Sequence, residues 1–223
     1  MSSADGGDLA ERLQAGLAEL GLALTDAQQR QLLDYLALLG QWNRVYNLTA
    51  LRDPAQMLTH HILDSLAVIA PLRRYLSEAE QGAAHPVRLL DVGSGGGLPG
   101  AVIAICQPEI TVTCVDAAAK KAAFIQQAAG LLHLPNLTGR HARVESLTGP
   151  FDIITSRAFA SLADFTAMSR GALAESGVWL ALKGKRPDAE IAALPPPVLT
   201  FHVEQLTVPG LDAQRCLVWL RLH

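Results

Sequence analysis

The stretch LLDVGSGGGLPG at residues 89–100 decides the fold expected for this chain of 223 residues. A short apolar run, 87–92, leads into the glycines, and a helical pattern over 99–106 follows them. This order of strand, glycine turn and helix is typical of ligand-binding βαβ units, because glycines let a ligand approach main-chain N–H groups with no Cβ in the way. The stretch therefore predicts an α/β protein.

The remainder of the chain continues the alternation of strands and helices. Short β-branched runs separated by helical stretches indicate a largely parallel sheet with right-handed crossovers. The expected strands are 87–92, 111–115, 137–142, 151–155 and 178–182, and the expected helices are 99–106, 118–132 and 162–174. Two further strand-like runs, 202–208 and 215–222, predict an antiparallel hairpin. We therefore expect a doubly wound, mostly parallel seven-stranded sheet over residues 85–223.

Residues 1–84 are expected to form an N-terminal helical segment packed on that core. Leucines at helical spacing predict a first helix. Thr25 begins a capping-box pattern that opens a second helix, which the polar run 43–47 is expected to end. A third helix is expected over 54–70, and the polar stretch 77–86 is interpreted as a link.

Composition excludes several classes of protein. No apolar run approaches the ~18 residues of a membrane span, and the first eight residues, MSSADGGD, lack the features of a secretory signal. We therefore expect a cytoplasmic protein with no membrane partner. Three cysteines lie singly in apolar runs, which predicts neither a disulfide framework nor a CxxC metal pair. The net charge of −3 argues weakly against a nucleic-acid partner, but basic residues are concentrated within 140–186.

The glycine stretch fits two cofactor patterns. Gly95 and Gly97, with a third glycine at position 100, satisfy GxGxxG, which is typical of NAD-binding oxidoreductases. Asp91, Gly93, Gly95 and Gly97 satisfy the DxGxGxG pattern of S-adenosylmethionine sites. The second pattern is favoured, because a carboxylate can accept hydrogen bonds from the cofactor's ammonium group, directly or through water, but repels a pyrophosphate. A purely structural glycine turn is the alternative.

Four more residues fall at the carboxyl ends of three expected strands. Asp116 ends the second strand, where a carboxylate can bind both ribose hydroxyls of a nucleoside or simply cap a helix. Val144 and Glu145 follow the third strand, where residues commonly flank an adenine ring, although a surface loop would look the same. Arg157 lies just past the fourth strand, at the edge where open α/β folds bind ligands.

Several sequence blocks together resemble the glucose-inhibited division protein B (RsmG) family, S-adenosylmethionine-dependent methyltransferases of 16S ribosomal RNA. The resemblance covers roughly residues 25–185, and the blocks that carry it are 42–49, 61–66, 91–100, 143–145, 156–162 and 181–185. It implies the class I S-adenosylmethionine methyltransferase fold. It also implies methylation of a guanine N7 in the 530 loop, with 16S rRNA or the small ribosomal subunit as partner.

The family's site residues carry over only where this sequence matches. Its cofactor positions correspond to Gly93, Leu98, Val144, Glu145 and Arg157. Its basic active-site cluster corresponds to Arg143, Arg157 and Lys183. The resemblance implies S-adenosylmethionine as cofactor, and the sequence leaves the oligomeric state open.

The chemistry of the residues is compatible with this implication. Guanine N7 carries a lone pair and no proton, so methylation there needs positioning but no general base. The chain lacks the Asn/Asp-Pro-Pro-aromatic motif of exocyclic-amine methyltransferases and the Pro-Cys nucleophile of cytosine-C5 enzymes. His60 and His61 are adjacent and lack an acidic triad, which argues against a metal site. The alternatives are a small-molecule S-adenosylmethionine methyltransferase, an NAD-binding oxidoreductase and a non-catalytic RNA-binding module.

Overall fold

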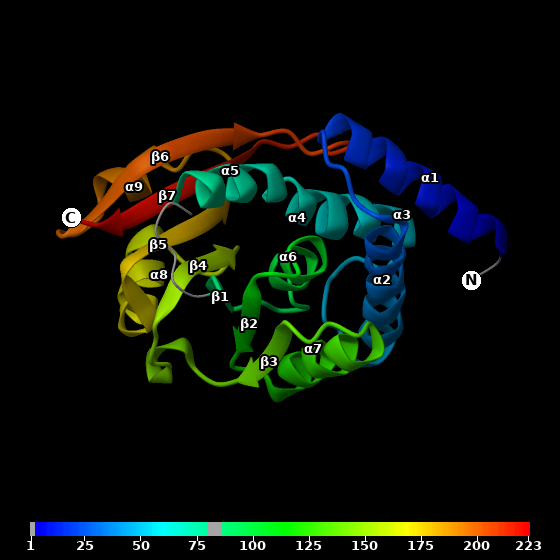
Figure 1. Cartoon of the computed structure of the whole chain (residues 1–223), viewed down its shortest axis with the longest axis horizontal. Helices are drawn as coiled ribbons and strands as arrows, with labels where there is room; N and C mark the ends of the chain where they lie inside the picture. The colour runs from blue at the N-terminus through cyan, green and yellow to red at the C-terminus, as the bar shows by residue number, and fades with distance from the viewer. Residues whose placement is uncertain (1–2, 80–85) are drawn as a thin grey trace.

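The computed structural model describes residues 3–79 and 86–223. Its centre is a seven-stranded sheet with strand order β3-β2-β1-β4-β5-β7-β6 (Figure 1). The strands are β1 (Arg88–Val92), β2 (Thr111–Asp116), β3 (Leu137–His141), β4 (Phe151–Arg157), β5 (Leu173–Lys183), β6 (Val198–Leu206) and β7 (Arg215–Leu222). Strands β1 to β5 run parallel, and β7 pairs antiparallel with both β5 and β6. The predicted doubly wound, mostly parallel sheet with a final hairpin is confirmed.

Helices cover both faces of the sheet. Two of the sheet's own helices, α6 (Gly100–Cys106) and α7 (Ala119–Leu131), share one apolar cluster with the N-terminal helices. Helices α8 (Leu162–Ser169) and α9 (Asp188–Ala192) pack in a second cluster on the opposite face (Figure 1). The N-terminal helices are α1 (Ser3–Glu19), α2 (Asp26–Tyr46), α3 (Pro54–Met57), α4 (Asp64–Leu66) and α5 (Ile69–Ala79). They lie against the α6 and α7 side of the sheet, as the apolar stripes of their sequences predict.

Helix α2 begins as predicted but ends later than predicted. The side chains and backbones of Thr25 and its capping partner form the complete capping box. The polar run that begins at Asn43 does not break the helix, because the buried Asn43 amide donates to the carbonyl oxygen of Leu51 (2.7 Å) and accepts from the N–H of Thr49 (2.8 Å). The helix ends only at Asn47, whose φ of 50° is left-handed.

The single helix predicted over 54–70 is wrong in detail. A π-helix, Leu58–Leu63, separates α3 from α4, and α5 then begins at position 69. Helix α5 also includes the first three residues of the predicted 77–86 link, because Leu72 and Leu76 continue its buried stripe. Residues 80–85 of that link lie outside the described residues. π-Helical turns occur frequently at functional sites, and this one faces the carboxyl edge of the sheet.

Two boundaries in the second half also differ from the prediction. The helix predicted to reach residue 174 ends at Ser169, and after a short 3₁₀ turn β5 begins at Leu173 rather than at 178. Leu173 pairs with Phe151 of β4, so tertiary pairing overrides a local segment that has no β-branched residues. Strand β6 likewise begins at Val198 instead of 202, directly after the proline run.

Candidate active site

The glycine loop between β1 and α6 lies at the carboxyl edge of the sheet, next to the end of β2. Gly93, Gly95 and Gly97 have φ angles of 62°, 59° and 77°. The N–H of Gly95 donates to Oδ2 of Asp116 (3.0 Å), which ties the loop to β2. A Cβ placed on Gly95 would meet no atom within 4 Å. The loop thus leaves open space above Gly95 that a ligand can occupy.

Helix α2 supports the glycine loop from beneath. The fully buried Tyr35 hydroxyl donates a hydrogen bond to the carbonyl oxygen of Gly96. A Cβ on Gly96 would lie 2.9 Å from Cδ1 of Leu39 on the same helix. The N-terminal helices therefore fix the position of the loop, a role that the apolar stripe of α2 did not reveal.

Asp91 is the buried carboxylate of the predicted cofactor motif. Its Oδ2 accepts from the N–H of Gly100 (2.9 Å), at the start of α6. Its Oδ1 is buried and has no hydrogen-bond partner among the described residues. Burial raises the pKa of Asp91 to about 7, although the bond from Gly100 and the charge of Arg157 oppose the rise. This oxygen is an acceptor without a donor, which is costly to leave in place unless a ligand supplies one.

A first cavity of about 460 Å³ lies over the carboxyl ends of β1, β2 and β3. This volume is within the ~300–1,000 Å³ usual for small-molecule sites. The cavity brings together five of the predicted site residues, namely Gly93, Asp116, Arg143, Val144 and Glu145. Oδ1 of Asp116 also accepts from the N–H of Ala118 (2.9 Å), and Lys121 Nζ lies 3.4 Å from its Oδ2. The Asp116 carboxylate is therefore held in place at the edge of this cavity.

Phe159 forms part of the wall of the first cavity beside the glycine loop. A Cβ on Gly93 would come within 2.3 Å of the Phe159 ring. The ring also contacts Phe165 edge-on, with 6.5 Å between centroids. Ala158, just before it, has a left-handed φ of 53° and lines the first cavity too. The turn after β4 thus shapes the space next to the glycine loop.

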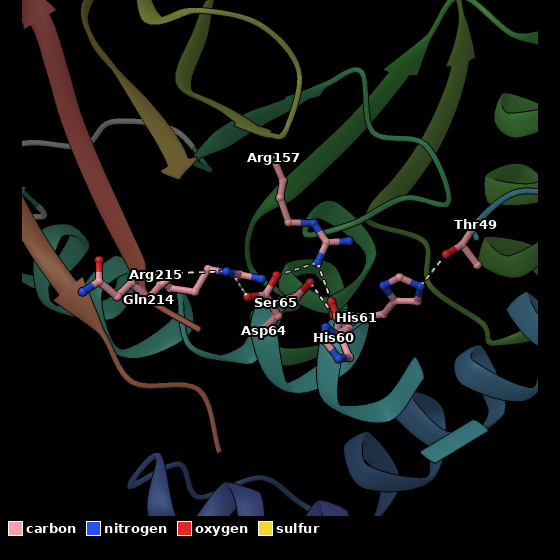
Figure 2. A network of polar contacts seen from close by, with 8 residues as sticks. All are labelled: Thr49, His60, His61, Asp64, Ser65, Arg157, Gln214 and Arg215. Atoms are coloured by element: carbon pink, nitrogen blue, oxygen red, sulfur yellow. Dashed lines mark hydrogen bonds and ion pairs between the residues drawn. The ribbon is translucent and has the colours of Figure 1, made fainter. Parts of the chain in front are cut away.

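A second cavity, of about 490 Å³, adjoins the first, because Ala158 lines both. It lies between the ends of β4 and β5, the start of β7 and the π-helix. Its polar and charged lining consists of His60, His61, Asp64, Arg157, Lys183 and Arg215. Figure 2 shows that the Arg157 side chain hangs from the end of β4 towards the π-helix.

Asp64 is the centre of the polar network in the second cavity (Figure 2). It is only 4% exposed. Its Oδ2 accepts from Nη1 of Arg157 (2.8 Å), and its Oδ1 accepts from Nε of Arg215 (2.7 Å). The same Nη1 of Arg157 donates to the carbonyl oxygen of His60 (3.1 Å). One carboxylate therefore joins the N-terminal helices to two strands of the sheet.

Lys183 also lines the second cavity, but protein groups already bind its ammonium. Nζ donates to the carbonyl oxygen of Ala160 (2.9 Å) and to Oε2 of Glu190 (2.8 Å).

His61 also lines the second cavity, and its ring is neutral. Burial, followed by the nearby charge of Arg157, lowers the pKa of His61 to about 4. Nε2 of His61 lies 2.8 Å from Oγ1 of Thr49.

The predicted basic cluster of Arg143, Arg157 and Lys183 is divided between the two cavities. Arg143 follows β3, whereas Lys183 ends β5, and strands β2, β1 and β4 lie between. Four strand spacings of ~4.8 Å separate these two positions by roughly 19 Å. Arg157, at the end of the intervening β4, is the member that lies nearest the boundary between the cavities.

The remaining predicted cofactor residues belong to the glycine loop and its surroundings but do not line either cavity. Within the described part of the chain, neither cavity lining includes Asp91, Gly95, Gly97 or Leu98. Gly95 turns an open backbone position towards solvent space, as above, whereas Leu98 is buried in the apolar core. These residues set the shape of the loop, and only Asp91 offers a free buried acceptor.

Sequence reasoning missed Asp64 and Arg215 as site residues. Asp64 interrupts the otherwise apolar stripe of the third predicted helix, and Arg215 begins an apolar strand. A charged residue in such a position must find a partner when it is buried, and this was the available signal. Arg157 lies 93 residues from Asp64 in the sequence, and Arg215 lies 151 residues away. No local pattern could therefore identify them as its partners.

Residues 3–79 and 86–223 contain neither a metal-binding cluster nor a membrane-spanning helix. No group of three or more His, Cys, Asp or Glu side chains is placed to hold a metal ion. None of the helices combines the length and the apolar character needed to cross a bilayer.

Solved structures share the fold of this chain. An S-adenosylmethionine-dependent methyltransferase from Aquifex aeolicus matches with a TM-score of 0.52 and 14% identity, over 78% of this chain and 96% of that chain. TrmN from Thermus thermophilus matches with a TM-score of 0.54 and 19% identity, over 74% of this chain and 53% of that chain. The architecture is therefore the class I S-adenosylmethionine methyltransferase fold predicted from the sequence.

Sequence relatives are much closer. A protein of Acidovorax ebreus named ribosomal RNA small subunit methyltransferase G is 65% identical over 99% of this chain and 99% of its own length. A protein of the same name from Acidovorax sp. strain JS42 is 68% identical over 94% of this chain and 93% of its own. The family model described as rRNA small subunit methyltransferase G matches residues 28–218. This chain belongs to the rRNA small subunit methyltransferase G family.

Proposed function

We propose that this protein transfers a methyl group from S-adenosylmethionine to N7 of a guanine in the 530 loop of 16S rRNA. The observation that carries the proposal is the pair of adjoining cavities at the carboxyl edge of the sheet, which meet at Ala158. One has the lining of a nucleoside site, and the other has an excess of cationic side chains. The family's name and the resemblance described above support the same reaction.

The residues of the first cavity fit S-adenosylmethionine. When bound, this cofactor supplies an electrophilic methyl group on a positively charged sulfur. Asp116 is placed to accept hydrogen bonds from ribose hydroxyls, and Val144 and Glu145 line the end of the cavity assigned to adenine. The open space above Gly95 and Oδ1 of Asp91, which has no partner among the described residues, support the fit, since an ammonium group would satisfy that oxygen directly or through water.

Methylation at N7 does not require the protein to remove a proton from the base. The acceptor atom carries a lone pair and no proton, so this chain needs to orient the base and exclude competing water. His61 is neutral above its lowered pKa, but the reaction has no proton for it to take. The base gains positive charge as the methyl group arrives. We therefore assign Arg157 an orienting role at the boundary between the cavities, not the stabilisation of an oxyanion.

The second cavity is the proposed entry for the target base. A loop guanine can be turned out of its stack for a few kcal/mol, and less if it is already unpaired. In this proposal residues 85–223 hold the cofactor, and residues 1–84 complete a wall of the second cavity through His60, His61 and Asp64. The substrate is 16S rRNA or the small subunit, and the protein acts in the cytoplasm.

Cofactor binding and methyl transfer test this function together. Calorimetry with S-adenosylmethionine and with NAD should show binding of the first only. Methyl-labelled cofactor should then label unmodified 16S rRNA, a partly assembled small subunit or the mature subunit, and a Gly95→Val variant provides the inactive control. Binding of NAD alone, or transfer to a metabolite fraction with no RNA present, would contradict the proposal.

A further inference from the structure

We propose that Asp64 is a positioning residue that sets Arg157 and Arg215 side by side as a binding site for a phosphate of the RNA substrate. This inference rests on the proposed function and adds to it an RNA-contacting group, Arg215, and the residue that aligns it. The site joins the N-terminal helices to two strands of the sheet, because Asp64 begins α4, Arg157 ends β4 and Arg215 begins β7.

Short hydrogen bonds to Asp64 hold both arginine side chains in this site (Figure 2). Each carboxylate oxygen of Asp64 serves a different arginine, at 2.8 Å for Arg157 and 2.7 Å for Arg215. The carbonyl oxygen of His60, on the π-helix, holds Arg157 from a second direction. The carbonyl oxygen of Gln214 accepts from Nη1 of Arg215 (2.9 Å). Both guanidinium groups are therefore oriented before any ligand arrives.

Each arginine keeps hydrogen-bond donors that the protein does not use. Among the described residues, no acceptor is found for Nε and Nη2 of Arg157 or for Nη2 of Arg215. Both side chains line the second cavity, and they remain 19% and 26% exposed. Guanidinium donors in a fixed fork match the oxygens of a phosphate. The unused donors thus belong to groups that are already aligned beside open space.

The charge of the network favours an anion. Two guanidinium groups so close together repel each other, and the single buried carboxylate of Asp64 offsets only one of the two charges. Lys183 adds little to this excess, because its ammonium is bound to Glu190. The remaining positive charge therefore lies on the arginine pair. S-adenosylmethionine carries no phosphate, so under the proposed function the phosphate comes from the RNA.

An ion pair that only stabilises the fold would look different. Buried ion pairs contribute little net stability, and one arginine would be enough to neutralise one carboxylate. Here a second arginine is brought from another strand to the same carboxylate, and both face a cavity next to the cofactor site. The arrangement leaves positive charge and unused N–H donors of Arg157 and Arg215 at the wall of the second cavity.

The Asp64→Asn variant gives the test, because two explanations predict opposite signs. If Asp64 acts only through its charge, removing that charge should tighten RNA binding and steepen its salt dependence. If Asp64 positions the arginines, the amide cannot accept from both, so kcat/KM for RNA methylation should fall about tenfold or more and RNA binding should weaken. Glu175→Gln, an exposed carboxylate at the opposite end of β5, is the matched control and should change neither.

A charge-conserving variant separates positioning from folding. Arg215→Lys keeps the positive charge but cannot serve Asp64 and a phosphate together, so kcat/KM should again fall about tenfold with an unchanged salt slope. Arg215→Ala should additionally lower that slope by about 0.7–0.9. S-adenosylmethionine affinity should stay at the wild-type value in both variants, because Arg215 does not line the first cavity. Circular dichroism should show a folded protein in each case, although Arg215→Ala should lower the melting temperature because it leaves Oδ1 of the buried Asp64 without its donor.

Several outcomes would overturn the inference. These are tighter RNA binding by Asp64→Asn, wild-type kcat/KM in both Arg215 variants, or loss of cofactor affinity together with RNA methylation, which would mark Asp64 as a folding residue. The wild-type protein is assayed first on 16S rRNA and on small subunits. Failure of the wild-type protein to methylate either substrate would refute the proposed function instead, and the two failures are thereby distinguished.

Discussion

The buried carboxylate of Asp91 predicts a pH dependence of cofactor binding. Burial raises the pKa of Asp91 to about 7, and its Oδ1 has no partner within the described residues. The ammonium group of S-adenosylmethionine should pair with the ionised carboxylate, so the apo protein must release a proton when it binds cofactor below pH 7. Affinity should therefore fall as the pH is lowered.

The size of this effect follows from the pKa. If the protein binds the cofactor only when Asp91 is ionised, Kd is proportional to 1 + 10^(pKa − pH). With a pKa of about 7, Kd should be roughly tenfold or more weaker at pH 5.5 than at pH 7, which is on the order of 1–2 kcal/mol. The ammonium group stays charged across this window, so the carboxylate alone sets the slope.

Calorimetry measures this linkage directly. Titrations at pH 5.5, 6, 6.5 and 7, in two buffers of different ionisation enthalpy, give both Kd and the number of protons released. Asp91→Asn should bind weakly at every pH, with no slope and no proton release. Constant wild-type Kd across the range, or wild-type affinity in Asp91→Asn at pH 7, would refute the role assigned to Asp91.

The same pKa shift predicts a stability trend in the absence of cofactor. The folded-state pKa of Asp91 is raised from its ordinary 3.8, so its stabilising contribution is complete below pH 3.8 and is lost as the pH rises through 7. The slope is ~1.4 kcal/mol per pH unit, or about 4 kcal/mol over the window. Urea unfolding of Asp91→Asn between pH 4.5 and 7 should lack this component. An identical slope in the wild-type protein and the variant would contradict the shift.

Three further variants test the rest of the site. Gly95→Val should place its side chain in the open space above the loop and abolish S-adenosylmethionine binding, and its left-handed φ should cost about 1–2 kcal/mol of folding free energy. Calorimetry and urea unfolding measure the two effects, and retained cofactor affinity would contradict the prediction. Tyr35→Phe should leave the buried Gly96 carbonyl without its donor, which lowers the free energy of unfolding by about 1–3 kcal/mol and weakens cofactor binding; unchanged cofactor affinity would show that α2 does not hold the loop. Arg143→Ala should lower the salt slope of RNA binding by about 0.7–0.9, and an unaltered slope would mean that this exposed arginine does not contact phosphate.

The sheet could be predicted from sequence because its strands carry their own periodic signal. The glycine turn after β1 and the capping box at Thr25 were found at their correct positions because each depends on residue types within a few positions of one another. The beginning of β5 could not be predicted, since Leu173 becomes a strand only through pairing with Phe151 of β4. The π-helix at Leu58–Leu63 has no distinct sequence pattern either, because its apolar spacing reads as continuous α-helix.

The lining of the first cavity could be predicted from sequence more fully than that of the second. Asp116 lies at a strand end adjacent to the glycine loop, so a local pattern sufficed. The separation of Arg143 from Lys183 depends on strand order, which places β2, β1 and β4 between them and cannot be read from spacing along the chain. Arg215 reaches Asp64 only because β7 inserts between β5 and β6.

Identification of the atom that receives the methyl group is the decisive test of the proposed reaction. Unmodified 16S rRNA and small subunits are treated with the wild-type protein and methyl-labelled S-adenosylmethionine, digested, and analysed by mass spectrometry of the nucleosides and by chemical mapping of the modified position. We expect one N7-methylguanosine in the 530 loop, formed in a single turnover at saturating cofactor with no titrating base near neutral pH. Methylation at N1 or N2 of guanine, or labelling of neither substrate, would contradict it.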